Sequence, residues 1–141
     1  MLSQLLHLKG ISSVVLERQT RDYVLSRIRA GVLEQGTVAL LRDAGVGDRM
    51  DRERLIHEGF DIAFSGRRHR VDLAAHTNGG VVTVYGQTEV THDLYDARDT
   101  MGGVVIDEAD NVTPHDAESD APYLTYEKDG QAHRVDCDFI A

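Results

Sequence analysis

The sequence predicts an α/β fold with antiparallel hairpins added to it, and three observations lead to that prediction. A helix-like segment over 1–9 is followed by an apolar, β-branched run over 12–17. A strand-like run over 81–85 is followed in turn by a helix-like segment over 87–101. The pair Asp129-Gly130 is a two-residue hairpin turn signal. The 141 residues allow one domain, or one piece of a larger domain.

The first third of the chain predicts a helix, a strand, a surface segment and a second helix. Met1–Lys9 places its leucines on one side, and a glycine follows as its stop. Ser12–Glu17 ends in an acid, a pattern typical of a buried parallel strand. Residues 18–31 show no clear period, so we expect a surface segment with at most a short helix. Val32–Ala44 regains helical spacing, and the glycine after it is placed as a C-cap.

The rest of the chain predicts strands around one long helix. From Leu55 the apolar residues alternate, and Ser65-Gly66 is placed as the turn of a hairpin that returns over Arg67–Leu73. Gln87–Met101 has helical spacing. The other expected segments are a strand at Val81–Tyr85, weak strands at Val104–Ile106 and Asn111–Thr113, an acidic loop at Pro114–Pro122, and a hairpin of Tyr123–Lys128 and Gln131–Cys137.

Charge is distributed unevenly along the chain. Residues 1–70 hold 12 Lys and Arg against 9 Asp and Glu, whereas residues 71–141 hold 3 against 15. We therefore expect any anion site in the first half, and no nucleic-acid partner, because the acidic second half would be repelled by a phosphate backbone. No apolar run approaches the roughly 20 residues of a membrane span. The first residues do not resemble a secretion signal, so we expect a cytoplasmic protein with no membrane partner.

The sequence offers no nucleophile and no metal site. The seven histidines show no paired metal-binding spacing, and no serine lies in a G-x-S-x-G turn. The single cysteine, Cys137, has no evident base and cannot form an internal disulfide. We therefore assign no catalytic residue and no metal ligand.

Four runs of residues carry a resemblance to a known family. They are LERQT at 16–20, DYVL at 22–25, RIRAGVLEQG at 27–36 and VYGQTEV at 84–90. In the order and spacing of these runs the chain resembles the flavin-dependent aromatic hydroxylases of the 4-hydroxybenzoate 3-monooxygenase family. The resemblance covers essentially the whole chain, whereas the chain covers only part of the family's pattern.

The resemblance implies a partial Rossmann-like FAD-binding domain over residues 1–141. Its expected form is a three-layer sheet with antiparallel hairpin additions, lacking the family's first strand and its glycine-rich phosphate loop. The implied reaction converts 4-hydroxybenzoate to 3,4-dihydroxybenzoate with O2, FAD and either NADPH or NADH. We expect the aromatic substrate to bind only in the full-length enzyme, so that the isolated chain is inactive.

Two further expectations concern what this chain does alone. The alternative to a piece of an enzyme is a non-enzymatic nucleotide-binding α/β module, or a truncated remnant. A missing first strand would leave a parallel sheet edge unpaired. We therefore expect self-association or aggregation, with a homodimer among the forms.

The resemblance also implies which residues would hold FAD. Glu17 would bind the adenosine ribose, with Arg18 near the adenine. Gln87 would lie against the flavin. The residues that would follow the flavin and its diphosphate are Arg27, Ile28, Arg29, Ala30, Gly31 and Val32, with Arg29 as the main positive contact. Without the resemblance, Glu17 also fits the end of a strand at the protein surface. Arg27 and Arg29 then fit a solvated pair.

The reductant would meet part of the same region. By resemblance Arg18, Gln19, Tyr23 and Arg27 lie near the adenosine phosphate of NADPH, where arginine favours a 2′-phosphate. The family pattern would place proline at the position of Arg21 and glycine at that of Ser26. These two differences leave the choice between NADPH and NADH open.

Overall fold

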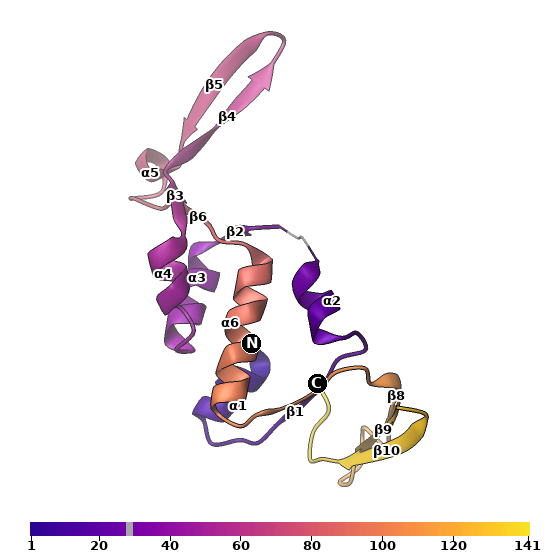
Figure 1. Ribbon diagram of the computed structural model, residues 1–141. Coiled ribbons are helices and arrows are strands. Elements are labelled where there is room, and N and C mark those ends of the chain that lie inside the picture. The colour runs from indigo at the N-terminus through magenta and orange to yellow at the C-terminus, as the bar shows by residue number, and fades with distance from the viewer. Residues whose placement is uncertain (28–29) are drawn as a thin grey trace.

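The computed structural model describes residues 1–27 and 30–141 (Figure 1). Within them the helices are α1 (Leu2–Leu8), α2 (Arg21–Ser26), α3 (Gln35–Asp43), α4 (Asp48–Glu53), α5 (Leu73–His76) and α6 (Gln87–Thr100). The strands are β1 (Val14–Leu16), β2 (Val32–Leu33), β3 (Leu55–His57), β4 (Gly59–Phe64), β5 (Arg67–Asp72), β6 (Val82–Val84), β7 (Val104–Ile106), β8 (Asp110–His115), β9 (Tyr123–Lys128) and β10 (Gln131–Asp136).

The described strands form both parallel and antiparallel pairs, which confirms the α/β class. β1 runs parallel to β7, with Val14 opposite Val104 and Leu16 opposite Ile106. β6 lies between β2 and β3, and β9 lies between β8 and β10, with antiparallel pairing in both sheets. β4 and β5 form the expected hairpin, except that Leu55–His57, expected in its first arm, form the separate strand β3 paired with β6. The parallel pair ends at Leu16 and Ile106, which places the next residue, Glu17, at the carboxyl edge of the sheet.

The core lies where α3, α4 and α6 meet the end of β6. Val38, Leu41 and Met50 are fully or almost fully buried there, and Tyr85 is 4% exposed. Partly buried apolar residues of α1 and α6 pack against this cluster. Burial of these apolar side chains stabilises the packing of α6 against α3 and α4. In Figure 1 α6 accordingly runs through the middle of the molecule.

The sequence prediction is wrong for the first part of the segment Val32–Ala44. Val32 and Leu33 form β2, which pairs with Thr83 and Val84 of β6, and the helix begins only at Gln35. A β-branched residue beside an available strand edge gains ladder hydrogen bonds that a helix start would not supply. The periodic pattern extended the helix across this boundary because apolar spacing alone does not distinguish a two-residue strand from a helix turn.

Three smaller differences have local causes. α4 was not predicted, because its sequence is almost entirely charged and shows little apolar spacing. α5 replaces the expected strand end at Leu73, since the Asp72 carboxylate accepts a hydrogen bond from the Ala75 backbone N–H and caps a helical turn. β8 continues through Pro114, where a loop was expected, because β8 is an edge strand and proline is tolerated there.

A buried arginine ties the parallel strand pair to α6. Arg98 is 5% exposed, and its Nη2 donates to the carbonyl oxygens of Ser13 at 2.9 Å and Val104 at 3.3 Å. These carbonyls belong to the segments that enter β1 and β7. Gly103 leaves the space for this arrangement, since a Cβ there would overlap the Arg98 guanidinium. The amino end of β1 is thereby fixed relative to the long helix.

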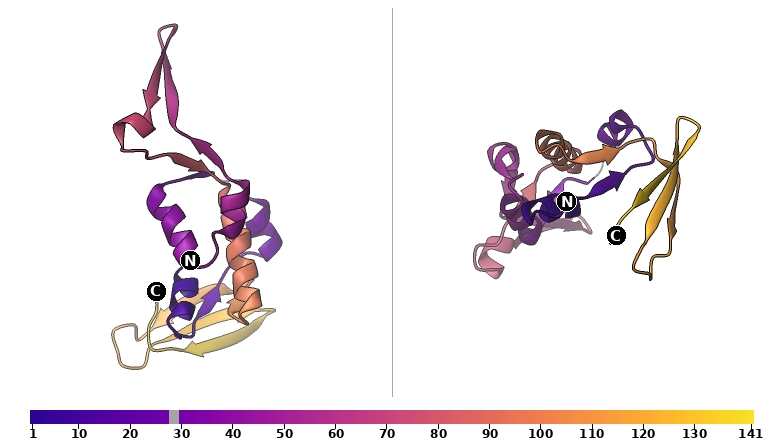
Figure 2. Two further views of the ribbon diagram at one scale, coloured as in Figure 1. Left: turned by 90° about the vertical axis from the view of Figure 1, so that its left-hand side faces the viewer. Right: turned by 90° about the horizontal axis from the view of Figure 1, so that it is seen from below.

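The β4–β5 hairpin projects away from the helices, and the β8–β9–β10 sheet lies at the opposite end (Figures 1 and 2). Phe60, Ile62 and Phe64 alternate along β4 and are between 44% and 58% exposed. Within the described residues no helix has both the length and the apolar character needed to cross a membrane.

Candidate functional site

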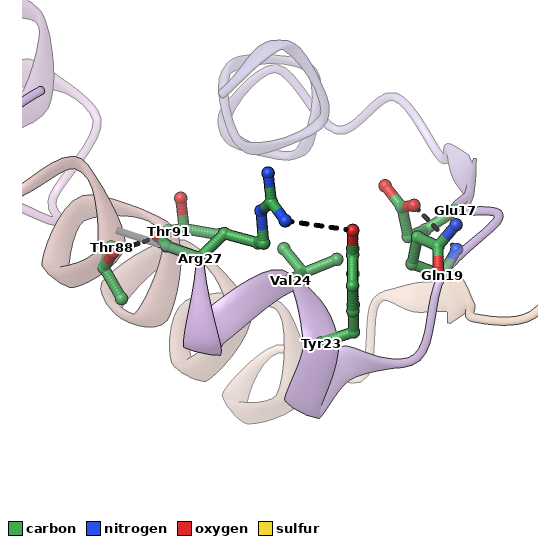
Figure 3. A pocket seen from close by; sticks show the side chains of 7 residues that line it. All are labelled: Glu17, Gln19, Tyr23, Val24, Arg27, Thr88 and Thr91. Atoms are coloured by element: carbon green, nitrogen blue, oxygen red, sulfur yellow. Dashed lines mark hydrogen bonds between the residues drawn. The ribbon is translucent and has the colours of Figure 1, made fainter. Parts of the chain in front are cut away.

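A cavity of about 180 Å³ lies between the end of β1, helix α2 and the first turns of α6. Its lining residues are Glu17, Gln19, Tyr23, Val24, Arg27, Thr88 and Thr91 (Figure 3). Four of them, Glu17, Gln19, Tyr23 and Arg27, are among the residues that the sequence analysis proposed for nucleotide binding. The structure therefore brings these four side chains to one place.

Glu17 enters the cavity from a fixed backbone. Its N–H donates to the Ile106 carbonyl oxygen at 2.9 Å, and its own carbonyl accepts from the Ala109 N–H at 2.9 Å. One carboxylate oxygen accepts the Gln19 backbone N–H at 2.8 Å. A carboxylate has about four acceptor positions, so capacity remains for hydroxyl donors of a ligand. The side chain is half-buried, which leaves it open to the cavity.

Helix α2 supplies the opposite wall. Thr20 caps it, since its Oγ1 accepts the Tyr23 N–H at 3.1 Å. The Arg27 Nη1 donates to the Tyr23 hydroxyl at 3.3 Å, and its guanidinium carbon lies 5.4 Å from the centre of the Tyr23 ring. In Figure 3 the Tyr23 ring stands between the Arg27 guanidinium and the Glu17 carboxylate. The wall thus offers one cation and one aromatic ring to a ligand.

The start of α6 closes the cavity and contacts the segment before β2. The Thr88 Oγ1 donates to the Arg27 carbonyl oxygen at 2.8 Å. The Gln87 N–H donates to the Ala30 carbonyl oxygen at 3.0 Å, and the Tyr85 N–H donates to that of Gly31 at 2.8 Å. A Cβ on Gly31 would lie 3.3 Å from the Cα of Gly86, so glycine allows this close approach of two backbones.

The predicted residues therefore fall into two groups. One group lines the cavity, and a second group, Ala30, Gly31, Val32 and Gln87, meets at the start of α6. Arg18 is exposed and adjacent to the first group but does not line the cavity. Ile28 and Arg29 lie outside the described residues, so their predicted contacts with FAD stay predictions.

Three lining residues were not predicted from the sequence. Thr88 and Thr91 are three apart on α6, and residues at this spacing share a helix face. Because Gln87 was expected at the cofactor, helical spacing from Thr88 could have found Thr91. Val24 lies in the run at 22–25 that carries the resemblance, but residues 18–31 show no period from which its helix face could be predicted.

A charged network supports the start of α6 from beneath. Arg49 of α4 contacts the carboxylates of Glu89 and of Asp93, the latter at 3.1 Å. The Tyr85 hydroxyl donates to the other Asp93 oxygen at 2.7 Å. Burial, and then this hydrogen bond to a carboxylate, raise the pKa of Tyr85 well above its usual range. The network holds α6 against α4 on the side away from the cavity.

A second, larger hollow of about 460 Å³ lies between α1, α4 and α6. Of the residues proposed from the sequence, none that the structure describes lines it. It is wide open to solvent, whereas the cavity beside Glu17 is more enclosed and combines a carboxylate, an arginine and an aromatic ring. We therefore take the smaller cavity as the candidate site. Its lining groups suit recognition of hydroxyls, a planar base or an anion rather than bond-breaking chemistry.

Comparison with protein families identifies the fold to which these features belong. The family described as FAD binding domain matches residues 1–141, the entire chain. The chain belongs to this family. A p-hydroxybenzoate hydroxylase of Acinetobacter baylyi (strain ATCC 33305 / BD413 / ADP1) is 48% identical over 141 residues. That match covers all of this chain and 35% of the relative, so the chain spans about a third of the length of the protein it resembles.

Solved structures support the same fold at lower sequence identity. The p-nitrophenol 4-monooxygenase PnpA from Pseudomonas putida DLL-E4 superposes with a TM-score of 0.79 at 17% identity, over 96% of this chain and 35% of that one. The flavin-dependent halogenase CmlS gives a TM-score of 0.74 at 20% identity, over 97% of this chain and 25% of that one. The described residues therefore have the fold of part of the FAD-binding domain found in flavin-dependent monooxygenases.

Proposed function

We propose that this chain forms the adenosine-binding part of the FAD domain of an enzyme that hydroxylates 4-hydroxybenzoate to 3,4-dihydroxybenzoate. The observation that carries the proposal is the single cavity in which Glu17, Gln19, Tyr23 and Arg27 meet. The 48% identity to a p-hydroxybenzoate hydroxylase supports the choice of substrate. The enclosed shape and mixed polarity of the cavity support a nucleotide as the ligand.

The residues present fit an adenosine portion of FAD. A carboxylate at the carboxyl edge of a parallel strand can accept hydrogen bonds from both hydroxyls of a ribose, and Glu17 has free acceptor capacity at that edge. The glycine at 31 permits close backbone approach beside the start of α6. When bound, FAD supplies the redox and oxygen chemistry, whereas these residues bind and orient it.

A substitution of Glu17 tests this assignment. Glu17→Gln keeps the side-chain shape and removes the charge, and we expect FAD affinity to fall by about 10-fold or more, because hydrogen bonds to charged groups are among the stronger ones. Glu118→Gln, on the exposed acidic segment before β9, is the matched control and should leave affinity unchanged. Equal FAD affinity of the Glu17→Gln and unchanged proteins would contradict the assignment.

The reductant and the substrate complete the proposal. We assign Glu17 to the FAD ribose, and Tyr23 and Arg27, on the opposite wall, to the adenosine phosphate of NADPH. Arg27→Ala is therefore expected to weaken NADPH binding more than NADH binding in the full-length enzyme. The aromatic substrate is assigned to the rest of that enzyme. We therefore expect the isolated chain to yield no 3,4-dihydroxybenzoate from 4-hydroxybenzoate, FAD and NADPH, and product formation would contradict this.

A further inference from the structure

Helix α2 carries the cavity wall, yet little apolar packing holds it in place. It has six residues, none of which is buried. Isolated helices of this length are unstable in water, so α2 depends on tertiary contacts for its position. Its C-terminal end is held by the hydrogen bond from Thr88 to the Arg27 carbonyl oxygen. On its N-terminal side the preceding segment is attached through the backbone, since the Gln19 carbonyl oxygen accepts the Glu108 N–H at 3.3 Å, and a side chain orients the first turn of α2.

Arg21, the first residue of α2, supplies that anchor. Its Nη1 and Nη2 donate to the two carboxylate oxygens of Asp99 at 2.6 Å and 3.1 Å. Its Nε lies 3.8 Å from the Asp107 carboxylate, and its guanidinium carbon lies 4.3 Å from the centre of the Tyr95 ring. A forked pair of hydrogen bonds combined with stacking fixes both the distance and the orientation of the guanidinium. The Arg21 anchor therefore joins α2 to α6 and to the end of β7.

The two anchors lie at opposite ends of the wall that carries Tyr23, Val24 and Arg27. Thr88 and Asp99 both belong to α6, so the wall is attached to a single rigid element at two points. Loss of the anchor at Arg21 would leave the N-terminal side of α2 held only through the backbone before it, and its first turn free to shift relative to α6. A ligand would then have to reorder the wall on binding, which reduces its affinity.

We propose that Arg21 is a positioning residue for the nucleotide cavity, acting through Asp99, Asp107 and Tyr95. This inference rests on the proposed function, since it assigns an adenine nucleotide to the cavity. Arg21 itself does not line the cavity, so its effect on affinity must pass through the placement of α2.

The experiment measures ADP binding by calorimetry in the purified protein, with Arg21→Ala and Arg21→Lys as variants. Arg134→Ala is the matched control, because Arg134 also pairs with a carboxylate, that of Asp136 at 2.6 Å, and also stacks on a ring, that of Tyr123 at 3.6 Å, but lies on β10. Arg21→Ala should weaken ADP about 3- to 10-fold, a modest effect because the pair is partly exposed. The ADP affinity of Arg21→Lys should lie between those of Arg21→Ala and the unchanged protein, and Arg134→Ala should bind ADP with unchanged affinity.

A charge exchange separates positioning from general stability. The double variant Arg21→Asp with Asp99→Arg re-creates the ion pair in reverse and should recover most of the ADP affinity that Arg21→Asp alone loses. Recovery of ADP affinity in the double variant supports the positioning role. An equal loss of ADP affinity in Arg21→Ala and Arg134→Ala overturns it. Normal ADP affinity in both Arg21→Ala and Arg21→Lys also overturns it. If the unchanged protein binds no ADP, the proposed function fails and this inference fails with it. Binding by the unchanged protein together with unaffected Arg21 variants removes the inference alone.

Discussion

Ionisation of the Tyr85 hydroxyl affects the stability of the contacts that support the candidate site. Tyr85 is buried, and its hydroxyl donates to the Asp93 carboxylate beside Arg49. Burial and the neighbouring carboxylate both favour the neutral phenol, which raises its pKa in the folded protein above the value of about 10 that a free tyrosine has. A group whose pKa is raised by folding contributes stability that is complete below its unfolded pKa and is lost as pH rises towards its folded pKa.

Tyr85→Phe should therefore have a pH-dependent cost. We expect the free energy of unfolding to fall by about 1–2 kcal/mol at neutral pH, because the hydroxyl no longer satisfies Asp93. The deficit should shrink at about pH 11, where an unfolded tyrosine is ionised and the unchanged protein has lost part of this contribution. Urea unfolding at about pH 8 and about pH 11 measures it. A deficit of equal size at both pH values would contradict this account.

The residues of the site illustrate what local patterns can predict. The place of Glu17 at the sheet edge was predictable because a strand pattern ends there, whereas its role as a nucleotide ligand came from the resemblance, since an acid at that place also fits a strand that ends at the surface. Tyr23, Arg27 and Gln87 required the resemblance, since polar residues in aperiodic segments have no position until the chain folds. The anchoring role of Arg21 depends on Asp99, 78 positions away in the sequence, and no local pattern contains that pairing.

Among the elements, the parallel pair β1–β7 depends on the buried guanidinium of Arg98. Arg98 donates to carbonyl oxygens at the entrances of both strands, and Gly103 makes room for its guanidinium. The position of Glu17 depends on this arrangement, because Glu17 directly follows β1.

Gly103→Ala should displace Arg98 and destabilise the protein by about 2–3 kcal/mol, the cost of leaving buried polar groups without partners. Gly36→Ala is the matched control: this glycine lies within α3, where an added Cβ meets nothing within 4 Å. That control should gain up to about 1 kcal/mol from helix propensity. Chemical denaturation gives both values. A Gly103→Ala protein as stable as the unchanged one would show that Arg98 is not held as described.

At the level of elements, prediction succeeded where periodicity was long and failed where it was short. α6 and the β9–β10 hairpin follow from many spaced residues and a strong turn signal. β2 and α4 do not, because two residues define no period and a charged six-residue helix presents no apolar stripe. Their formation depends on partners distant in sequence, β6 for the strand and α6 for the helix.

For the molecule as a whole, exposed apolar surface is the main liability. Phe60, Ile62 and Phe64 are exposed on the projecting hairpin, and Val14 is 43% exposed on β1. Apolar residues on exposed strands favour pairing between chains. We therefore expect the purified chain to elute from size-exclusion chromatography as oligomers or aggregates, including dimers. A single monomer peak across the concentration range would contradict this expectation.

The most direct test of the whole account is an FAD titration of the purified protein, followed by flavin fluorescence and the visible spectrum. The account predicts saturable binding, because the cavity beside Glu17 already combines the groups that an adenosine portion needs. A signal that grows linearly with protein concentration and never saturates would show that these residues do not form a binding site for FAD.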